Sequence, residues 1–246
     1  MKLLALVVLA AACGHSKAES PVPTPAQIVA NPDRTKHDLE LDAGRKPVDM
    51  LTFFALTPGM HVADLGAGGG YTTELVARSV GPSGVVFAQD TPNWGAAELD
   101  KIWKQRLTRP GMANTHHAMR QWDDPLPPEA KSLDAVTFVC AYHDVVAENS
   151  DPKKLNQAVF AALKSGGTYT VIDNSAKDGS GVADCDKLHR IDEKVVRDDV
   201  LAAGFKLARQ AEFLRNSGDA RDWNADPGAD PRTHTQDRFV LEFVKP

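Results

Sequence analysis

The chain has 246 residues, of which 42% are hydrophobic and 25% are charged. These values are typical of one globular domain with a sizeable core. The formal net charge of −5 provides no basic surface of the kind that nucleic-acid-binding domains use, so we expect no nucleic-acid partner. No apolar run reaches the roughly 18 residues of a membrane-spanning helix.

The first 13 residues have the pattern of an export signal. Lys2 precedes an apolar run over residues 3–9, and three alanines follow it. Cys13 comes next, in the place of the lipidated cysteine of a bacterial lipobox, although that motif prefers leucine where Ala10 stands. We expect an exported chain, either periplasmic or a lipoprotein that touches the membrane only through Cys13. A cleaved signal followed by an incidental cysteine is the alternative.

Residues 14–25 are polar and rich in proline, which suits an extended tether and cannot form a core. Residues 26–246 then form a single domain. Cys140 and Cys185 could pair in an oxidising compartment, but the apolar sequence around Cys140 favours a buried free thiol. No C-x-x-C pair or histidine–cysteine cluster indicates zinc, so we expect no metal site.

A charged segment precedes the first predicted strand. Arg34, Asp38 and Asp42 are spaced by four residues, as on one face of a helix. A solvated helix face is one interpretation of this segment. The other is that the segment covers a ligand site and that Asp42, Arg45 or Lys46 touches the ligand.

A glycine-rich turn at residues 66–70 is the strongest local signal in the sequence. It follows a short apolar strand, residues 61–65, and precedes an amphipathic helix, residues 72–80. Alternating glycines let the backbone turn sharply and approach a ligand, and the helix presents free N–H groups to it. A P-loop is excluded because no Gly-Lys-Ser/Thr follows. A dinucleotide loop is disfavoured because Tyr71 stands where its third glycine belongs.

The next apolar strand, residues 84–90, ends in Asp90. A carboxylate at the end of the strand beside a glycine-rich loop can accept both ribose hydroxyls of a nucleoside. Asp90 also opens a proline-containing turn, so a surface aspartate is the alternative. A helix over residues 96–107 and a strand over residues 114–119 follow.

An almost unbroken apolar run over residues 133–141 predicts a central parallel strand, covered on both faces. It ends in Tyr142, His143 and Asp144, where open α/β sheets bind their ligands. His143 can titrate near neutrality, and Asp144 could orient it. A helix start with His143 turned to solvent is the alternative. His189, beyond the next strand, could close over the same site.

The rest of the chain alternates between predicted helices and strands. Helices are expected over residues 151–163 and 193–203. Strands are expected over residues 168–174, 205–210 and 237–244, and the last strand is expected to be antiparallel at or near an edge of the sheet.

Two of these segments resemble class I S-adenosylmethionine (SAM) methyltransferases. Residues 64–70 match the D-x-G-x-G-x-G loop of that family, and residues 163–167 match its Leu-Lys-x-Gly-Gly pattern before the fifth strand. The resemblance covers about residues 47–246. It implies an α/β, Rossmann-like fold with a mostly parallel seven-stranded sheet, helices on both faces and an antiparallel last strand.

The resemblance also implies a set of site residues. In this family the acid that opens the glycine loop lies near the amino-acid half of SAM, and the turn after the third strand often gives an acid and an apolar residue to adenine. The implied SAM-binding residues are Asp64, Gly66, Ala67, Gly68, Gly70, Tyr71, Asp90, Trp122 and Asp123. From their places after strand ends, the candidate catalytic residues are Tyr142, His143 and His189, with either histidine as the base for a hydroxyl acceptor.

The favoured function is therefore a methyltransferase that uses SAM as its cofactor and acts on an unidentified small molecule. Several shorter motifs look like those of a group of exported bacterial predicted methyltransferases. SAM is made in the cytoplasm, however, and the chain has an export signal. A second hypothesis is therefore a non-catalytic envelope lipoprotein that binds a nucleoside-like or other small ligand in a reused SAM cleft. A third hypothesis is an NAD-dependent oxidoreductase, which is disfavoured because Tyr71 replaces the third glycine of a dinucleotide loop.

Overall fold

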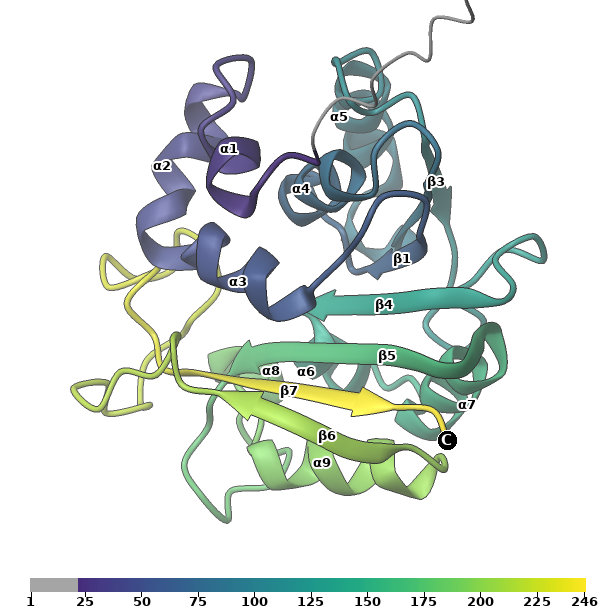
Figure 1. The fold of residues 1–246 in the computed structure, drawn as a ribbon. Coiled ribbons are helices and arrows are strands. Elements are labelled where there is room, and N and C mark those ends of the chain that lie inside the picture. The colour runs from purple at the N-terminus through teal and green to yellow at the C-terminus, as the bar shows by residue number, and fades with distance from the viewer. Residues whose placement is uncertain (1–21) are drawn as a thin grey trace, which may run out of the picture.

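The computed structural model describes residues 22–246, and Figure 1 shows their fold. The predicted export signal, Cys13 and residues 14–21 of the predicted tether lie outside the described residues. Helix α1 begins at Pro25 and is capped by Thr24, so it starts slightly before the predicted domain boundary. Within residues 22–246, no helix is long and apolar enough to cross a membrane.

The elements follow the predicted alternation of helices and strands. The helices are α1 (Pro25–Val29), α2 (Lys36–Arg45), α3 (Pro47–Phe54), α4 (Tyr71–Val80), the 3₁₀ turn η1 (Pro92–Trp94), α5 (Ala96–Arg106), α6 (Tyr142–Ala147), α7 (Pro152–Ala162), α8 (Cys185–Leu188) and α9 (Glu193–Ala202). The strands are β1 (His61–Leu65), β2 (Val85–Asp90), β3 (Thr115–Met119), β4 (Leu133–Val139), β5 (Leu163–Asn174), β6 (Lys206–Ala211) and β7 (Arg238–Val244). Strand β5 begins earlier than predicted and includes the glycine pair that was expected to precede it.

The strands form one seven-stranded sheet in the order β3-β2-β1-β4-β5-β7-β6. Strands β1 to β5 pair in parallel, whereas β7 is inserted antiparallel between β5 and β6. Along the chain, β2 and β3 are added on one side of β1, whereas β4 is added on its other side, so the strand order reverses between β1 and β4. Ligands of open α/β sheets bind beside such a reversal, at the carboxyl ends of the strands. The predicted fold class, with its antiparallel last strand, is confirmed.

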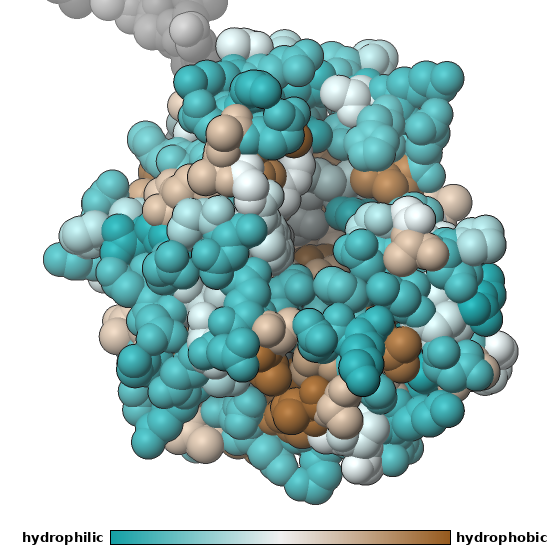
Figure 2. Space-filling view, turned by 180° about the vertical axis from the view of Figure 1, so that it is seen from behind, coloured by the Kyte–Doolittle hydropathy of each residue, from teal (hydrophilic) through white to brown (hydrophobic). Residues whose placement is uncertain are grey.

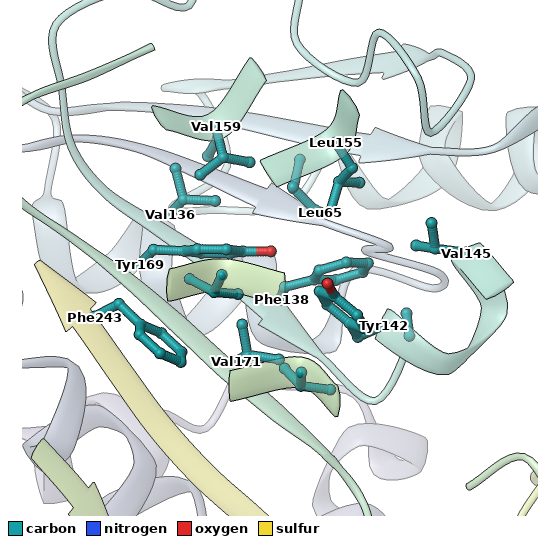
Figure 3. Close-up of a cluster of buried hydrophobic side chains, with 14 of the residues drawn as sticks. Leu65, Val136, Phe138, Tyr142, Val145, Leu155, Val159, Tyr169, Val171 and Phe243 are labelled. Carbon is teal, nitrogen blue, oxygen red and sulfur yellow. The ribbon is translucent and has the colours of Figure 1, made fainter. Parts of the chain in front are cut away.

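Helices cover both faces of the sheet, and each face has its own hydrophobic core (Figure 1). Because side chains alternate along a strand, Val62 faces the core under α3, α4 and α5, whereas Leu65 faces the core under α6, α7 and α9. Figure 3 shows this second core, which we call the α6–α9 core. There, Leu65 and Val136 of the sheet lie near Val159 of α7. These two cores fix the strands whose ends carry the site.

The two cysteines of the described part of the chain are free thiols. Cys185 is buried in the α6–α9 core. Cys140 follows the end of β4 with a left-handed φ of 58°, so it lies just outside the strand in which it was predicted. Burial raises the pKa of the Cys140 thiol.

The charged segment before β1 is not a solvated helix face. Asp38 of α2 is buried and accepts two hydrogen bonds of 3.0 Å from Arg106 of α5. Arg106 also donates to the buried Glu74 of α4 at 2.7 Å. Arg34 binds Asp42 through both terminal nitrogens, each at 2.7 Å. The ion pairs of Arg106 tie α2 to α4 and α5, next to the glycine loop.

Glu74 is the centre of this network, because Arg78, Arg106 and Arg109 all bind its carboxylate. We expect Glu74→Ala to lower the free energy of unfolding by about 3–5 kcal/mol, since it leaves buried guanidinium groups without their shared partner. Urea unfolding followed by circular dichroism measures the loss. The control is Glu98→Ala, which removes an exposed ion pair and is expected to cost less than about 1 kcal/mol. Equal losses in the two variants would contradict this account.

Candidate functional site

A cavity of about 550 Å³ opens at the carboxyl ends of β1, β4 and β5. Its walls come from α2, the glycine loop, the residues that follow β4, the segment around His189 and residues 225–238. Figure 2 views the molecule from the side opposite to Figure 1 and shows a hollow near the centre of a largely hydrophilic surface. The volume of the cavity lies within the range of about 300–1,000 Å³ that is usual for small-molecule sites.

The glycine loop forms one wall of the cavity. Gly66, Gly68 and Gly70 have φ angles of 60°, 55° and 78°, in the left-handed region that glycine enters without steric cost. A Cβ on Gly66 would lie 2.6 Å from a neighbouring alanine side chain, so no larger residue fits there. Gly66, Ala67, Gly68 and Tyr71 line the cavity, whereas Gly70 packs against α5.

Asp90 binds the backbone of the glycine loop and does not line the cavity. Its Oδ1 accepts a hydrogen bond of 2.6 Å from the backbone N–H of Gly68. Its Oδ2 accepts from Trp103 Nε1 at 2.8 Å and lies 2.9 Å from His117 Nε2. The side chain is fully buried. Each carboxylate oxygen thus has a protein partner and Asp90 does not reach the cavity, so the ribose contact stays a prediction.

Asp64 is the penultimate residue of β1 and lines the cavity. Its Oδ1 accepts a hydrogen bond of 2.7 Å from the Thr137 hydroxyl, and its Oδ2 accepts one of 2.6 Å from Thr73. Burial raises the pKa of Asp64 to about 6, although these two hydrogen bonds act in the opposite direction. A cationic ligand group beside Asp64 would favour the charged carboxylate.

Helix α2 contributes one of the three residues that were predicted to touch ligand. Arg45 lines the cavity and stacks over the ring of Tyr71, with 4.6 Å between the guanidinium carbon and the ring centroid. Asp42 instead accepts a hydrogen bond of 2.7 Å from the Tyr71 hydroxyl. Lys46 donates to the carbonyl of Phe213 at 2.6 Å. Of these three residues Arg45 alone lines the cavity, and its contact with a ligand stays a prediction.

Neither of the two residues predicted to contact adenine lines the cavity, and the structure corrects that expectation. Trp122 is fully buried, and its Nε1 donates to Glu148 at 2.9 Å. Asp123 is exposed and accepts a hydrogen bond of 2.9 Å from Lys154. The indole points into the α6–α9 core because burial of its large apolar surface is favourable. Trp94 lines the cavity instead.

Tyr142, predicted as a catalytic residue, belongs to the α6–α9 core. It is fully buried, and its ring packs against Phe138 with 5.7 Å between ring centroids (Figure 3). Its hydroxyl accepts a hydrogen bond of 2.8 Å from Asn156 Nδ2 and lies 3.3 Å from Asp199. The hydroxyl is therefore satisfied inside the protein, and Tyr142 does not reach the cavity.

His143 lines the cavity from the first turn of α6, and its side chain is only 3% exposed. Its Nδ1 lies 2.8 Å from Oδ1 of the buried Asp173, at the end of β5, and its backbone N–H donates to Oδ2 of the same carboxylate at 2.8 Å. Burial lowers the pKa of His143, but the charges of Asp173 and Asp144 outweigh burial and raise the pKa to about 9.

His189 and Asp144 meet His143 at the cavity wall, although His189 is far away in sequence. His143 Nε2 lies 3.2 Å from His189 Nδ1 and 3.4 Å from Asp144 Oδ1. His189 Nδ1 lies 3.6 Å from the same Asp144 oxygen. The prediction that both histidines lie at one site is consistent with this geometry, whereas the alternative of a solvent-facing His143 is wrong.

The cavity wall also carries charge that sequence reasoning missed. Arg238, at the start of β7, is 3% exposed and pairs with no carboxylate among the described residues. Its Nη2 donates to the carbonyl of Gly44 at 2.6 Å, and its Nε has no acceptor. Burial and the charges of Arg45 and Arg238 lower the pKa of the neighbouring His234. A buried cation without a counter-ion indicates a place for an anionic ligand group.

Further polar atoms in the wall lack partners. Asn174 Oδ1 and Gln236 Oε1 are buried without a hydrogen bond, and both residues line the cavity. Asp173 and Asn174 end a predicted strand, so their polar character was visible in the sequence. Gln236 and Arg238 precede or begin the last strand, which the sequence did not connect with the site.

A family model matches part of the chain. Residues 42–118, from α2 to β3, match the model of Protein-L-isoaspartate(D-aspartate) O-methyltransferase. The matched part contains the glycine loop and Asp90 but is less than half of the chain. It does not include His143 or His189, so it describes one side of the cavity.

Solved structures that are similar over most of the chain share its fold. A SAM dependent methyltransferase from Aquifex aeolicus is 19% identical with a TM-score of 0.59, over 90% of this chain and 98% of its own. A TehB-like SAM-dependent methyltransferase from Corynebacterium glutamicum is 13% identical with a TM-score of 0.52, over 83% and 87%. Aeropyrum pernix fibrillarin, in complex with natively bound S-adenosyl-L-methionine, is 12% identical with a TM-score of 0.53, over 83% and 76%. The chain has the class I methyltransferase fold.

The raised pKa of Asp64 predicts a pH dependence of stability. Because the folded pKa of about 6 exceeds the ordinary aspartate value of 3.8, the folded state binds more protons between these values. Asp64 therefore destabilises the fold increasingly as pH rises from about 4 to about 6, by about 3 kcal/mol in total. We expect the stability of wild type relative to Asp64→Asn to fall over this window in urea unfolding. The control is Asp222→Asn at an exposed position. The prediction is contradicted if the difference in unfolding free energy between wild type and Asp64→Asn does not change between about pH 4 and about pH 6.

Proposed function

We propose that the protein is a SAM-dependent methyltransferase whose acceptor is a small molecule. The observation that carries the proposal is the cavity of about 550 Å³ beside Asp64 and the left-handed glycines. It lies at the carboxyl ends of parallel strands, where this fold binds ligands. Fold alone does not establish activity, so the proposal rests on the charges and shape of this cavity.

The cavity offers opposite charges for the amino-acid end of SAM. In the proposed pose the Asp64 carboxylate receives the ammonium group of the cofactor, and the Arg45 guanidinium receives its carboxylate. Arg45 has no carboxylate within ion-pair distance among the described residues, and the charge of Arg45 acts on the pKa of Asp64. The glycine loop carries no charged side chain, so its backbone can approach the sulfonium closely.

The acceptor is proposed to lie on the side of His143 and His189. Its nucleophilic atom attacks the methyl carbon in line with the carbon–sulfur bond, that bond breaks, and the sulfonium becomes a neutral thioether. A hydroxyl acceptor also loses a proton. The histidine pair is placed to receive it once His143 is neutral, which its raised pKa of about 9 favours at alkaline pH. The protein contributes mainly the positioning of the two reactants.

The unpaired Arg238 refines the class of acceptor. We infer that the acceptor carries an anionic group, such as a carboxylate, which pairs with this buried guanidinium. The orphaned Asn174 Oδ1 and Gln236 Oε1 would accept hydrogen bonds from hydroxyl or amino groups of the same molecule. Such a ligand satisfies polar atoms that are otherwise costly to bury.

Cofactor binding is tested by calorimetric titration of the full chain with SAM, its demethylated product and NAD. We expect micromolar binding of SAM and product, and none of NAD. Asp64→Asn should weaken SAM binding about 10- to 100-fold, since an ionised contact is lost. Asp123→Asn is the matched control, because this carboxylate lies outside the cavity. Failure to bind SAM, or equal loss in both variants, would overturn the assignment.

The acceptor class is tested with SAM carrying a labelled methyl group. A panel of small hydroxy and amino acids is compared with their matched primary amides. We expect transfer to the acids, and a fall of about 10- to 100-fold in kcat/KM for them in Arg238→Gln. The control is Arg209→Gln, whose guanidinium pairs with Glu242 outside the cavity.

Equal transfer to the amides would contradict the anionic acceptor. Tight SAM binding with no transfer to any member of the panel would instead favour the second hypothesis, a non-catalytic protein that keeps a ligand in the SAM cleft.

A further inference from the structure

His143, Asp144 and His189 bring three metal-ligating atoms together at the cavity wall. His143 Nε2, His189 Nδ1 and Asp144 Oδ1 lie within 4.8 Å of one another. We propose that these three side chains bind one zinc-class divalent metal ion and leave its fourth coordination position open to the cavity. Binding of the ion does not depend on methyl transfer, so this inference goes beyond the function proposed above.

The spacing of the three atoms favours four-coordinate geometry. Their separations are 3.2, 3.4 and 3.6 Å. Ligands at about 2.0–2.1 Å from a tetrahedral zinc ion lie about 3.3–3.4 Å apart, whereas right-angled ligands of an octahedral ion lie about 3.0 Å apart. All three separations exceed the octahedral value, and their mean agrees with the tetrahedral one. Two histidines and one carboxylate are also a ligand set of catalytic zinc sites that keep an open position.

Asp173 supports His143 in the way that outer partners support metal-bound histidines. A ligating histidine commonly donates its other ring N–H to a carboxylate, which fixes the tautomer and the ring orientation. Asp173 is fully buried and lies 2.8 Å from His143 Nδ1, so His143 Nε2 is turned toward His189. The backbone N–H groups of His143 and Asn174 donate to the same carboxylate, both at 2.8 Å, and hold it in place.

The backbone conformation at His189 is fixed by a hydrogen bond from Asn174. His189 has a left-handed φ of 50°, which is uncommon for residues other than glycine. Asn174 Nδ2 donates to the carbonyl of His189 at 3.0 Å and stabilises this conformation. The oxygen of the same Asn174 amide is buried, lacks a donor and belongs to a residue that lines the cavity. A water molecule or acceptor hydroxyl on the open metal position would supply that missing donor.

Without a metal, a proton shared between the two facing imidazoles would explain their contact equally well. The two accounts differ in what they predict for metal titration. An ion held by three protein ligands binds with a fixed stoichiometry and a defined geometry. A hydrogen-bonded pair of imidazoles gives neither.

The probe is Co²⁺, because a four-coordinate Co²⁺ ion absorbs visible light much more strongly than a six-coordinate one. The full chain is stripped with a chelator and titrated with Co²⁺. We expect one equivalent to bind with the strong absorption of the four-coordinate ion, and Zn²⁺ to displace it. His189→Ala and Asp144→Asn should each abolish the strong absorption. His61→Ala should leave it unchanged, because His61 is exposed at the opposite end of β1.

Asp173→Asn separates a metal site from a hydrogen-bonded pair. Loss of an outer partner is expected to weaken Co²⁺ binding about 10- to 100-fold while the stoichiometry stays at one. Circular dichroism monitors folding of every variant. The proposal is overturned by an absence of saturable binding, by binding without the strong absorption, or by a strong absorption that survives both ligand variants. SAM titration is a separate measurement, so failure here leaves the cofactor assignment unaffected.

Discussion

The site depends on the hydrogen bonds that the buried Asp90 carboxylate accepts. It binds the backbone of Gly68, the indole of Trp103 and the imidazole of His117, so it joins the glycine loop to α5 and β3. A carboxylate enclosed in this way is stable because each of its oxygens has a donor. The loop is therefore fixed before any ligand arrives. Pre-organisation of this kind lowers the cost of binding, since little conformational freedom remains to be lost.

The parts of the fold that the sequence predicted are those specified by local patterns. Alternating glycines after a short apolar strand require left-handed backbone, and Gly66, Gly68 and Gly70 adopt it. Apolar runs for buried parallel strands, and glycines at helix ends, placed the seven strands and the helices α4, α5, α7 and α9 to within about five residues. The sheet order then follows, because parallel strands joined by helices leave few ways to cover both faces. The wall formed by the glycine loop and Asp64 could thus be predicted.

The opposite wall, which includes His143 and Arg238, depends on contacts between segments that are distant in sequence. No local sequence pattern encodes such contacts. His143 reaches the cavity, whereas the adjacent Tyr142 turns into the core, because the first turn of α6 directs the two side chains differently. Trp122 was predicted at the site from the family resemblance, but burial of its indole is favoured over a place in the cavity wall. Arg238 is brought in by β7, from the far end of the chain. Residue type and spacing do not predict such choices, since tertiary packing decides them.

In the proposed function, the charges of the cavity bind parts of the cofactor that do not take part in the reaction. Methyl transfer neutralises the sulfonium, so a carboxylate placed directly against it would stabilise the reactant more than the transition state and slow the reaction. In the proposed pose, Asp64 and Arg45 bind the ammonium and carboxylate groups, which do not react. The uncharged glycines lie against the sulfonium. The energy of the charged contacts then serves to position the methyl group toward the acceptor.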